Sequence, residues 1–360
     1  MKIGLFLPTS TNAQLVSTTT PQFEPTYDRL LDIVTKAERY GIDFGLSLVK
    51  YHGFGGPSRY WDASLDPFTC LAGLIARTSR IKLFATAPVL ALHPALVARA
   101  AATIDSISPG RFGLNVVTGW LRAEYESMGL WPGADHFERR YKLAGEYVKI
   151  LRELWATGRS DFKGEFYTMD DCRMEPLPCG GIDIVSAGQS DAGLEFAARY
   201  ADYSFISTTG TNDPASVAGL EQRTARAEQA VGRKVGSYPL VILVAAETDG
   251  EAMDRWNHYC SGIDTEALAW AGRQASQDTR SAAAQDSTAR MVMQSGDIAM
   301  GTGRFVGSYE NVARMLDEMA SYPHISGIML GMGDWFTGVE DFGERIQPLM
   351  KSRATARAAA

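Results

Sequence analysis

Residues 100–120 read AAATIDSISPGRFGLNVVTGW. They contain the junction between a predicted helix and a predicted strand, and this alternation of helix and strand recurs along the chain. A helical pattern opens with proline, runs over Pro94–Ile107 and stops at the turn residues 108–110, which are Ser-Pro-Gly. The apolar run Arg111–Thr118 follows that turn directly and has the character of a buried strand. This segment therefore predicts a helix that leads straight into a parallel strand.

The same alternation covers most of the chain. The other expected strands are Lys2–Pro8, Asp43–Leu48, Ile81–Val89, Ile182–Ala187, Tyr203–Ser207, Leu240–Ala246 and Gly327–Gly331. The other expected helices are Tyr27–Tyr40, Asp66–Thr78, Phe137–Ala156, Ser190–Tyr200, Pro214–Val231 and Val339–Met350. Strands that alternate with helices indicate βαβ units and a parallel sheet. Eight strands fit a closed (β/α)8 TIM barrel better than an open sheet, so we predict one α/β barrel domain over residues 1–352.

Two stretches interrupt the alternation. Residues 158–181 are rich in turn formers, and residues 274–304 are rich in Ser, Ala, Gln, Asp and Gly with little apolar periodicity. Long irregular segments inside a compact domain are typically functional or disordered. We expect both to be insertions at the C-terminal face of the barrel, the second containing a lid, and we expect residues 353–360 to form a disordered tail.

Composition narrows the class of protein. The formal net charge is -7 and there is no basic cluster, which argues against binding to nucleic acid or to an anionic membrane. The N-terminus lacks a signal-peptide pattern and no apolar run has bilayer length, so we expect a cytoplasmic protein. The four cysteines form no CxxC motif and are expected to be reduced, one incidental disulfide being the alternative. The five histidines have no zinc spacing, so no metal site is expected.

Polar residues gather where the strands of the expected barrel end, which is where such barrels carry their active sites. Lys50, Thr86 and Asn115 lie at or near the ends of strands. Ser190 follows a glycine-bearing turn at the start of a helix, so it is either part of a phosphate site or an ordinary serine cap. Asn115 is either a structural bridge or a ligand contact, because a buried amide needs partners. Arg140, in the first turns of a helix, is either a ligand contact or part of a solvated face.

The run 100–120 resembles the bacterial luciferase-like flavin monooxygenase superfamily and, within it, the pyrimidine monooxygenases of the uracil-degradation (Rut) pathway. The other stretches that carry the resemblance are Lys2–Pro8, Lys50–Gly56, Glu138–Tyr141, Asp161–Arg173 (DFKGEFYTMDDCR), Ala187–Gly193 (AGQSDAG) and Phe342–Met350 (FGERIQPLM). Together they span almost the whole chain.

This resemblance implies a two-component monooxygenase that uses O2 and reduced FMN (FMNH2) from a separate NAD(P)H:flavin reductase. The implied FMN contacts are Val49, Lys50, Asn115, Glu124, Arg140, Tyr141 and Ser190. Arg140 and Ser190 would hold the phosphate, and Thr86 and Asn115 would be the catalytic residues that hold oxygen near the flavin N5. The implied chemistry is a flavin-N5-peroxide that attacks an electron-poor carbon, as in oxidative ring opening of uracil-like pyrimidines.

The match is weaker where a substrate is expected, around Tyr51-His52 and residues 207–211. The alternative activity is oxidative dehalogenation of polyhalogenated aromatics, or cleavage of another carbon–heteroatom bond, by the same flavin chemistry. A hydrophobic pocket would favour a haloarene, whereas inward amide and hydroxyl groups would favour uracil. A non-catalytic flavin-binding protein is the alternative from another class. A homo-oligomer is expected in each case.

Overall fold

The structure is a computed structural model that describes residues 1–278 and 288–357. It confirms the TIM barrel: the parallel strands follow one another around the barrel, and β9 pairs with both β8 and β11 to close it. The barrel strands are β1 (Lys2–Leu7), β2 (Phe44–Ser47), β3 (Lys82–Pro88), β4 (Phe112–Val117), β7 (Asp183–Ala187), β8 (Tyr203–Ser207), β9 (Gly236–Ala246) and β11 (Gly327–Met332). Each of the eight expected strands coincides with one of them.

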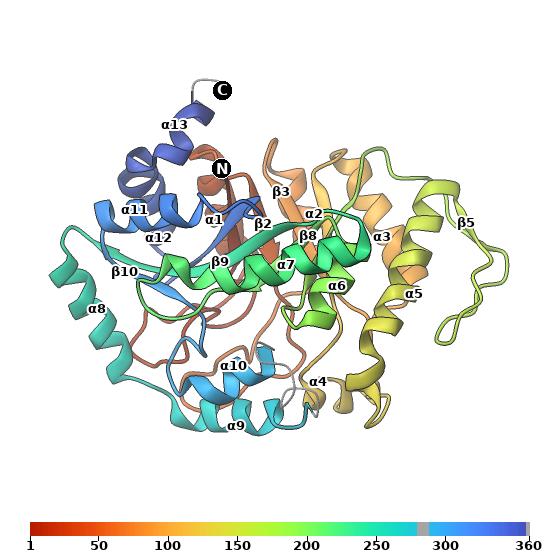
Figure 1. Cartoon of the computed structure of the whole chain (residues 1–360), viewed down its shortest axis with the longest axis horizontal. Helices are drawn as coiled ribbons and strands as arrows, with labels where there is room; N and C mark the ends of the chain where they lie inside the picture. The colour runs from red at the N-terminus through yellow and green to blue at the C-terminus, as the bar shows by residue number, and fades with distance from the viewer. Residues whose placement is uncertain (279–287, 358–360) are drawn as a thin grey trace.

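Helices surround this barrel (Figure 1). Those between or after the strands are α1 (Tyr27–Arg39), α2 (Pro67–Ala76), α3 (Pro94–Ile107), α5 (His136–Thr157), α6 (Asp191–Tyr200), η1 (Pro214–Val217) with α7 (Ala218–Val231), α8 (Asp249–Ser261), α11 (Tyr309–Met319), α12 (Gly338–Asp341), η2 (Phe342–Ile346) and η3 (Gln347–Leu349). Helices α4 (Arg122–Glu126), α9 (Thr265–Ala275) and α10 (Thr288–Ser295) gather at the end opposite the N-terminus, at the bottom of Figure 1. That end is the C-terminal face of the strands. The sequence pattern does not predict helices α4, α8, α9, α10 and α11.

One strand was missed. β10 (Arg304–Ser308) pairs in parallel with β9 from Ile242 to Ala246, beyond the point where β8 stops pairing at Leu240. β9 is longer than its neighbour, so its second half has an edge that another strand can cover. Residues 274–304 have little apolar periodicity up to Arg304, where β10 begins, so the sequence pattern does not predict this strand.

Aromatic side chains fill the N-terminal half of the barrel interior. Tyr238 stacks between Phe44 and Tyr203, with ring centroids 4.4 Å apart in both pairs. Phe84 meets Phe44 edge-on at 6.0 Å. These rings are contributed by the first residues of β2 and β8 and by the early part of β3 and β9. The interior is therefore packed at this end, and the space for a ligand lies toward the other.

The first insertion is not at the C-terminal face. Residues 158–181 form a hairpin in which β5 (Arg159–Ser160) pairs with β6 (Cys172–Arg173), and it lies along the outside of α5. The Glu146 carboxylate on α5 accepts hydrogen bonds from the backbone N–H groups of Glu165, Phe166 and Tyr167, at 2.7, 2.9 and 3.1 Å. The hairpin follows the C-terminal end of α5, so the chain has already returned to the opposite side of the barrel when the hairpin begins.

The expected tail is also partly wrong. α13 (Lys351–Arg357) is helical, and Arg353 within it is buried. The Arg353 guanidinium donates to the carbonyl of Met1 at 2.8 Å and to the Asp43 carboxylate at 2.7 Å, which fastens this helix to the N-terminal ends of β1 and β2. Residues 358–360 lie outside the described part of the chain. All four cysteines have free thiols. Within residues 1–278 and 288–357, no helix has the length and apolar character needed to cross a bilayer.

Candidate active site

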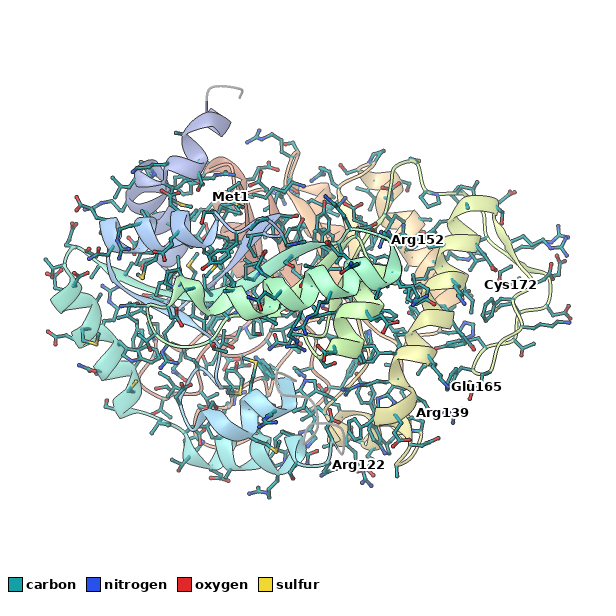
Figure 2. The ribbon with its side chains drawn as sticks, in the orientation of Figure 1. Met1, Arg122, Arg139, Arg152, Glu165 and Cys172 are labelled. Carbon is teal, nitrogen blue, oxygen red and sulfur yellow. The ribbon has the colours of Figure 1, made fainter. Side chains whose placement is uncertain are left out.

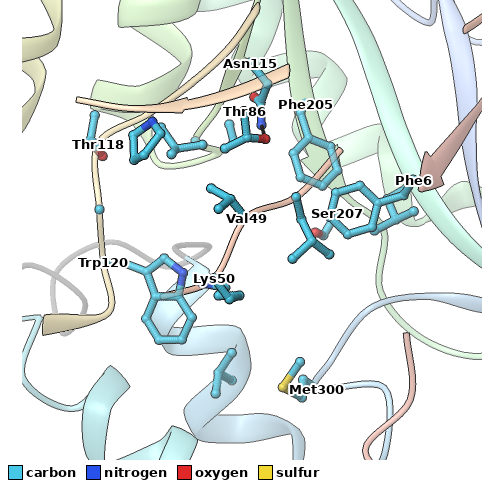
Figure 3. Close-up of a pocket in the computed structure, with 18 of the residues that line it drawn as sticks. Phe6, Val49, Lys50, Thr86, Asn115, Thr118, Trp120, Phe205, Ser207 and Met300 are labelled. Atoms are coloured by element: carbon cyan, nitrogen blue, oxygen red, sulfur yellow. Dashed lines mark hydrogen bonds between the residues drawn. The ribbon is translucent and has the colours of Figure 1, made fainter. Parts of the chain in front are cut away.

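A cavity of about 230 Å³ opens at the C-terminal face of the barrel. All of the site residues expected from the resemblance line it, namely Val49, Lys50, Thr86, Asn115, Glu124, Arg140, Tyr141 and Ser190. Figure 3 shows Thr86 and Asn115 at one side of this cavity and Lys50 and Trp120 across from them. The tertiary structure therefore brings together residues that the sequence spreads over about 140 positions.

Thr86 and Asn115 lie opposite each other on β3 and β4. The Asn115 side-chain Nδ2 donates to Thr86 Oγ1 at 2.9 Å, and the Thr86 hydroxyl in turn donates to the Ser47 carbonyl on β2. The Asn115 Oδ1 is buried and has no hydrogen-bond partner among the described residues. The Thr86 hydroxyl proton is therefore engaged within the protein, and the Asn115 amide presents an open acceptor to the cavity.

Lys50 is held between aromatic rings and a carboxylate. Its ammonium lies 3.3 Å from Glu124 Oε2, 4.8 Å from the centre of the Trp61 ring and 5.5 Å from that of Trp120. The other Glu124 oxygen accepts a hydrogen bond from the backbone N–H of Tyr51 at 3.1 Å. Lys50 and Glu124 side chains are only 11% and 5% exposed, so this is a buried ion pair. Lys50 is therefore not a solvated surface lysine.

The turn between β7 and α6 has the shape expected of an anion site. Ser190 caps α6, its Oγ accepting from the Gly193 N–H at 3.2 Å, and it lies 3.5 Å from the Tyr141 hydroxyl. A Cβ added at Gly188 or Gly193 would meet that hydroxyl at 2.7 Å. Because neither glycine has a Cβ, the Tyr141 hydroxyl can approach this turn closely. The turn and the hydroxyl together form a small cradle at the N-terminus of α6, which fits a phosphate group.

The adjacent arginines of α5 have different surroundings. Arg139 is on the surface, paired with Asp135 and Glu165, and Figure 2 shows it beside Glu165 at the outer edge of the molecule. Arg140 is buried and lines the cavity, where its Nη1 donates to Asp278 Oδ2 at 3.0 Å. Its Nε is buried without a hydrogen-bond partner among the described residues. A buried guanidinium with an open donor fits an anionic ligand.

Other lining residues were not singled out from the sequence. Phe6 and Phe205 stack at 5.6 Å on one wall. Gln189 accepts from the Ser207 N–H at 2.7 Å and donates to the Met291 sulfur at 2.8 Å, which connects the turn between β7 and α6 to α10. The described part of 274–304 contributes further lining residues, which are Asp278, Met291, Val292, Ala299, Met300 and Thr302. This part of the second insertion lies at the cavity, as expected. Its motion as a lid stays a prediction.

Burial changes the titration of groups around the site. It lowers the pKa of His136, whose Nε2 lies 2.9 Å from the Gly119 carbonyl oxygen, so the imidazole is held neutral. Burial also raises the pKa of Tyr125 well above its ordinary range, which keeps that phenol protonated. Among the described residues, no group of three or more His, Cys, Asp or Glu side chains has the arrangement of a metal site.

Comparison with known proteins adds family information to this geometry. The family model described as luciferase-like monooxygenase matches residues 1–322. The chain is 52% identical over 354 residues to the pyrimidine monooxygenase RutA of Serratia proteamaculans (strain 568), covering 98% of this chain and 96% of that protein.

Solved structures agree on the fold. A riboflavin lyase (RcaE) superposes with a TM-score of 0.84 at 20% sequence identity, covering 98% of this chain and 92% of the other. A long-chain alkane monooxygenase (LadA) superposes with a TM-score of 0.79 at 18% identity, covering 98% and 91%. At this level of sequence identity, these two structures support the barrel fold and nothing beyond it.

Proposed function

This chain belongs to the luciferase-like monooxygenase family, and from that premise we propose that it is a pyrimidine monooxygenase that opens the ring of uracil-like substrates with O2 and reduced FMN. The observation that carries the substrate class is the 52% identity, over 98% of the chain, to a protein named pyrimidine monooxygenase. Reduced FMN comes from a separate flavin reductase in this proposal.

The residues of the cavity fit the cofactor. Arg140 and Ser190 would bind the phosphate, together with the Tyr141 hydroxyl beside the glycine cradle. Val49, Lys50 and Glu124 would contact the flavin farther into the cavity, where all three line the wall. When bound, reduced FMN supplies the electrons that activate O2 for attack on an electron-poor carbon.

The Asn115 amide and the Thr86 hydroxyl position the reacting groups. Asn115 Oδ1 is an open, buried acceptor, suited to a flavin or substrate N–H group. The Thr86 hydroxyl donates to the Ser47 carbonyl while it accepts from Asn115, and this chain of bonds fixes the amide in one orientation. A fixed orientation lowers the reorganisation needed during reaction.

The side chains around the cavity also favour a pyrimidine over a haloarene. Amide and hydroxyl groups line it at Gln14, Thr86, Asn115, Thr118, Gln189, Ser207 and Thr302. A site that hydrogen-bonds polar substrate groups rejects analogues without them. A chlorinated ring would leave the open Asn115 Oδ1 without a donor, so we do not favour the dehalogenase alternative.

The test is product analysis with reductase, NAD(P)H, FMN and one candidate substrate at a time. Uracil and thymine are compared with a chlorinated phenol and an alkyl sulfone, under 18O2. We expect substrate-dependent oxygen uptake with uracil and a ring-opened acid that contains one atom of 18O. Turnover of the chlorinated phenol without turnover of either pyrimidine would overturn the proposal. Oxygen uptake that no substrate accelerates would support the non-catalytic alternative.

A further inference from the structure

The charges that line the cavity cancel in pairs. Its described lining residues include two cations and two carboxylates: Lys50 is paired with Glu124, and Arg140 with Asp278. The phosphate of FMN brings a charge of about -1.5 to -2 at neutral pH, if it resembles other phosphate monoesters. Each cation of the described cavity wall is therefore already neutralised by a carboxylate, and a phosphate that binds the open Nε of Arg140 must compete with Asp278 for that guanidinium.

The pair nearest the phosphate cradle is Arg140 with Asp278. The Arg140 guanidinium lies over the Tyr141 ring at 5.4 Å from its centre, and the Tyr141 hydroxyl is 3.5 Å from Ser190 Oγ. Asp278 follows the end of α9, where its backbone N–H donates to the Ala275 carbonyl at 3.2 Å. The Arg140 and Asp278 side chains are 8% and 1% exposed. Water screens such a pair weakly, so a second anion beside Asp278 would be repelled strongly.

We propose that Asp278 competes with the FMN phosphate for Arg140 and thereby sets the affinity and residence time of the cofactor. The inference rests on the phosphate assignment in the proposed function. Phosphate binding is coupled to separation of Asp278 from Arg140, and the free energy of that separation is subtracted from the phosphate affinity. Asp278 is thus a positioning residue that acts through the arginine.

Such competition suits an enzyme whose flavin is reduced on another protein, because the cofactor must enter and leave the cavity repeatedly. A carboxylate that returns to Arg140 when the phosphate departs keeps the buried guanidinium paired in the empty enzyme. Without it, the empty cavity would contain an uncompensated charge, which is costly in a buried site. The binding step would then be too favourable for rapid release.

The test compares Asp278→Asn with Glu266→Gln, a matched control that removes one negative charge from an exposed position on α9, the helix that ends just before Asp278. In full-length protein, we expect Asp278→Asn to lower the dissociation constant for FMN about tenfold or more, equivalent to about 1.4 kcal/mol. The FMN dissociation rate measured by stopped flow should fall in parallel, and the KM for reduced FMN should fall without a rise in kcat. Riboflavin has no phosphate, so its affinity should stay unchanged. The control should leave both flavin affinities unchanged.

Thermal unfolding separates competition from a merely structural role. If Asp278 competes with the phosphate, Asp278→Asn should have a lower melting temperature without ligand and should recover to the wild-type value or above with saturating FMN. If Asp278 is merely structural, the melting temperature should be lower both with and without FMN. Weaker FMN binding, or an unchanged ratio of FMN to riboflavin affinity, would overturn the inference. Arg140→Ala is measured beside it. If that variant loses FMN selectivity while Asp278→Asn is silent, only the inference about Asp278 fails; if Arg140→Ala is also silent, the phosphate assignment fails.

Discussion

The amide of Asn115 and the hydroxyl of Thr86 form one hydrogen-bonded unit across β3 and β4, at 2.9 Å. The hydroxyl donates a hydrogen bond to the Ser47 carbonyl on β2, so three neighbouring strands are connected at the edge of the cavity. The Asn115 side-chain Oδ1 remains without a hydrogen-bond partner among the described residues. Positioning by Thr86 and contact by Asn115 are therefore separable roles.

Substitution of this unit should uncouple flavin oxidation from product formation. We expect Asn115→Leu to retain FMN binding and to slow product formation about 100- to 1,000-fold, the cost of losing one preorganised polar contact to the reacting groups. Thr86→Val should have a smaller effect, since it frees the amide without removing it. Stopped-flow oxidation of enzyme-bound reduced FMN, with product and hydrogen peroxide measured in parallel, checks this. Near-normal product yield in both variants would mean that oxygen is held elsewhere.

Removal of the Arg140 side chain should weaken binding of FMN far more than binding of riboflavin. A charge-assisted hydrogen bond contributes about 1.5–3 kcal/mol, so Arg140→Ala should raise the FMN dissociation constant by roughly 10- to 150-fold. Ser190→Ala should act in the same direction and more weakly, because the cradle glycines remain. Arg139→Ala is the matched control, since Arg139 is exposed and paired on the surface. Equal losses for the two flavins would contradict the phosphate assignment.

The Lys50–Glu124 pair should show strong coupling in a double-mutant cycle. Lys50→Met leaves a buried carboxylate without its cation, and such a change costs about 3–5 kcal/mol of unfolding free energy. Adding Glu124→Gln removes the stranded charge and should restore a large part of that loss. Chemical denaturation of the two single variants and the double variant gives the coupling energy. Additive losses would show that the two side chains act independently.

His136 should make the protein less stable as the pH falls through the weakly acidic range. Burial lowers its pKa below the ordinary value of about 6.5, with Arg140 adding to the shift and Asp278 opposing it. As the pH falls, His136 therefore takes up a proton near pH 6.5 in the unfolded chain, whereas in the folded protein it stays neutral until the pH is lower. The stabilisation is complete above that pH and declines below it, by at most about 1.4 kcal/mol per pH unit. Chemical denaturation at pH values from 7.5 to 5 should show that the free energy of unfolding declines less in His136→Gln than in the wild type. Parallel plots of unfolding free energy against pH for the two proteins would refute this.

Turnover should require a separate reductase. The sequence contains no GxGxxG nicotinamide fingerprint, so the purified chain is not expected to oxidise NAD(P)H. With NAD(P)H, FMN, O2 and uracil, product should form only after a flavin reductase is added, or after FMN is reduced chemically. Steady NAD(P)H consumption by the purified protein alone would disprove the two-component scheme.

The sequence by itself determined the barrel, because each buried strand is a short apolar run that turn residues mark off, and this pattern depends only on local order. It also predicted the turn that we propose as the phosphate site, since Gly188 and Ser190 lie between a strand and a helix in immediate succession. These features need no knowledge of what packs against them.

Only the tertiary structure decided which polar groups meet. Arg139 and Arg140 are indistinguishable in sequence, yet neighbouring helical residues point about 100° apart, so the placement of α5 buries one and exposes the other. Asp278 lies 138 residues after Arg140 in a segment without periodicity, and only the closure of the barrel brings the two within 3.0 Å. Strand β10 and the burial of Arg353 could not be predicted from the sequence for the same reason. Their partners are distant in sequence, and the burial that stabilises them exists only once the chain has folded.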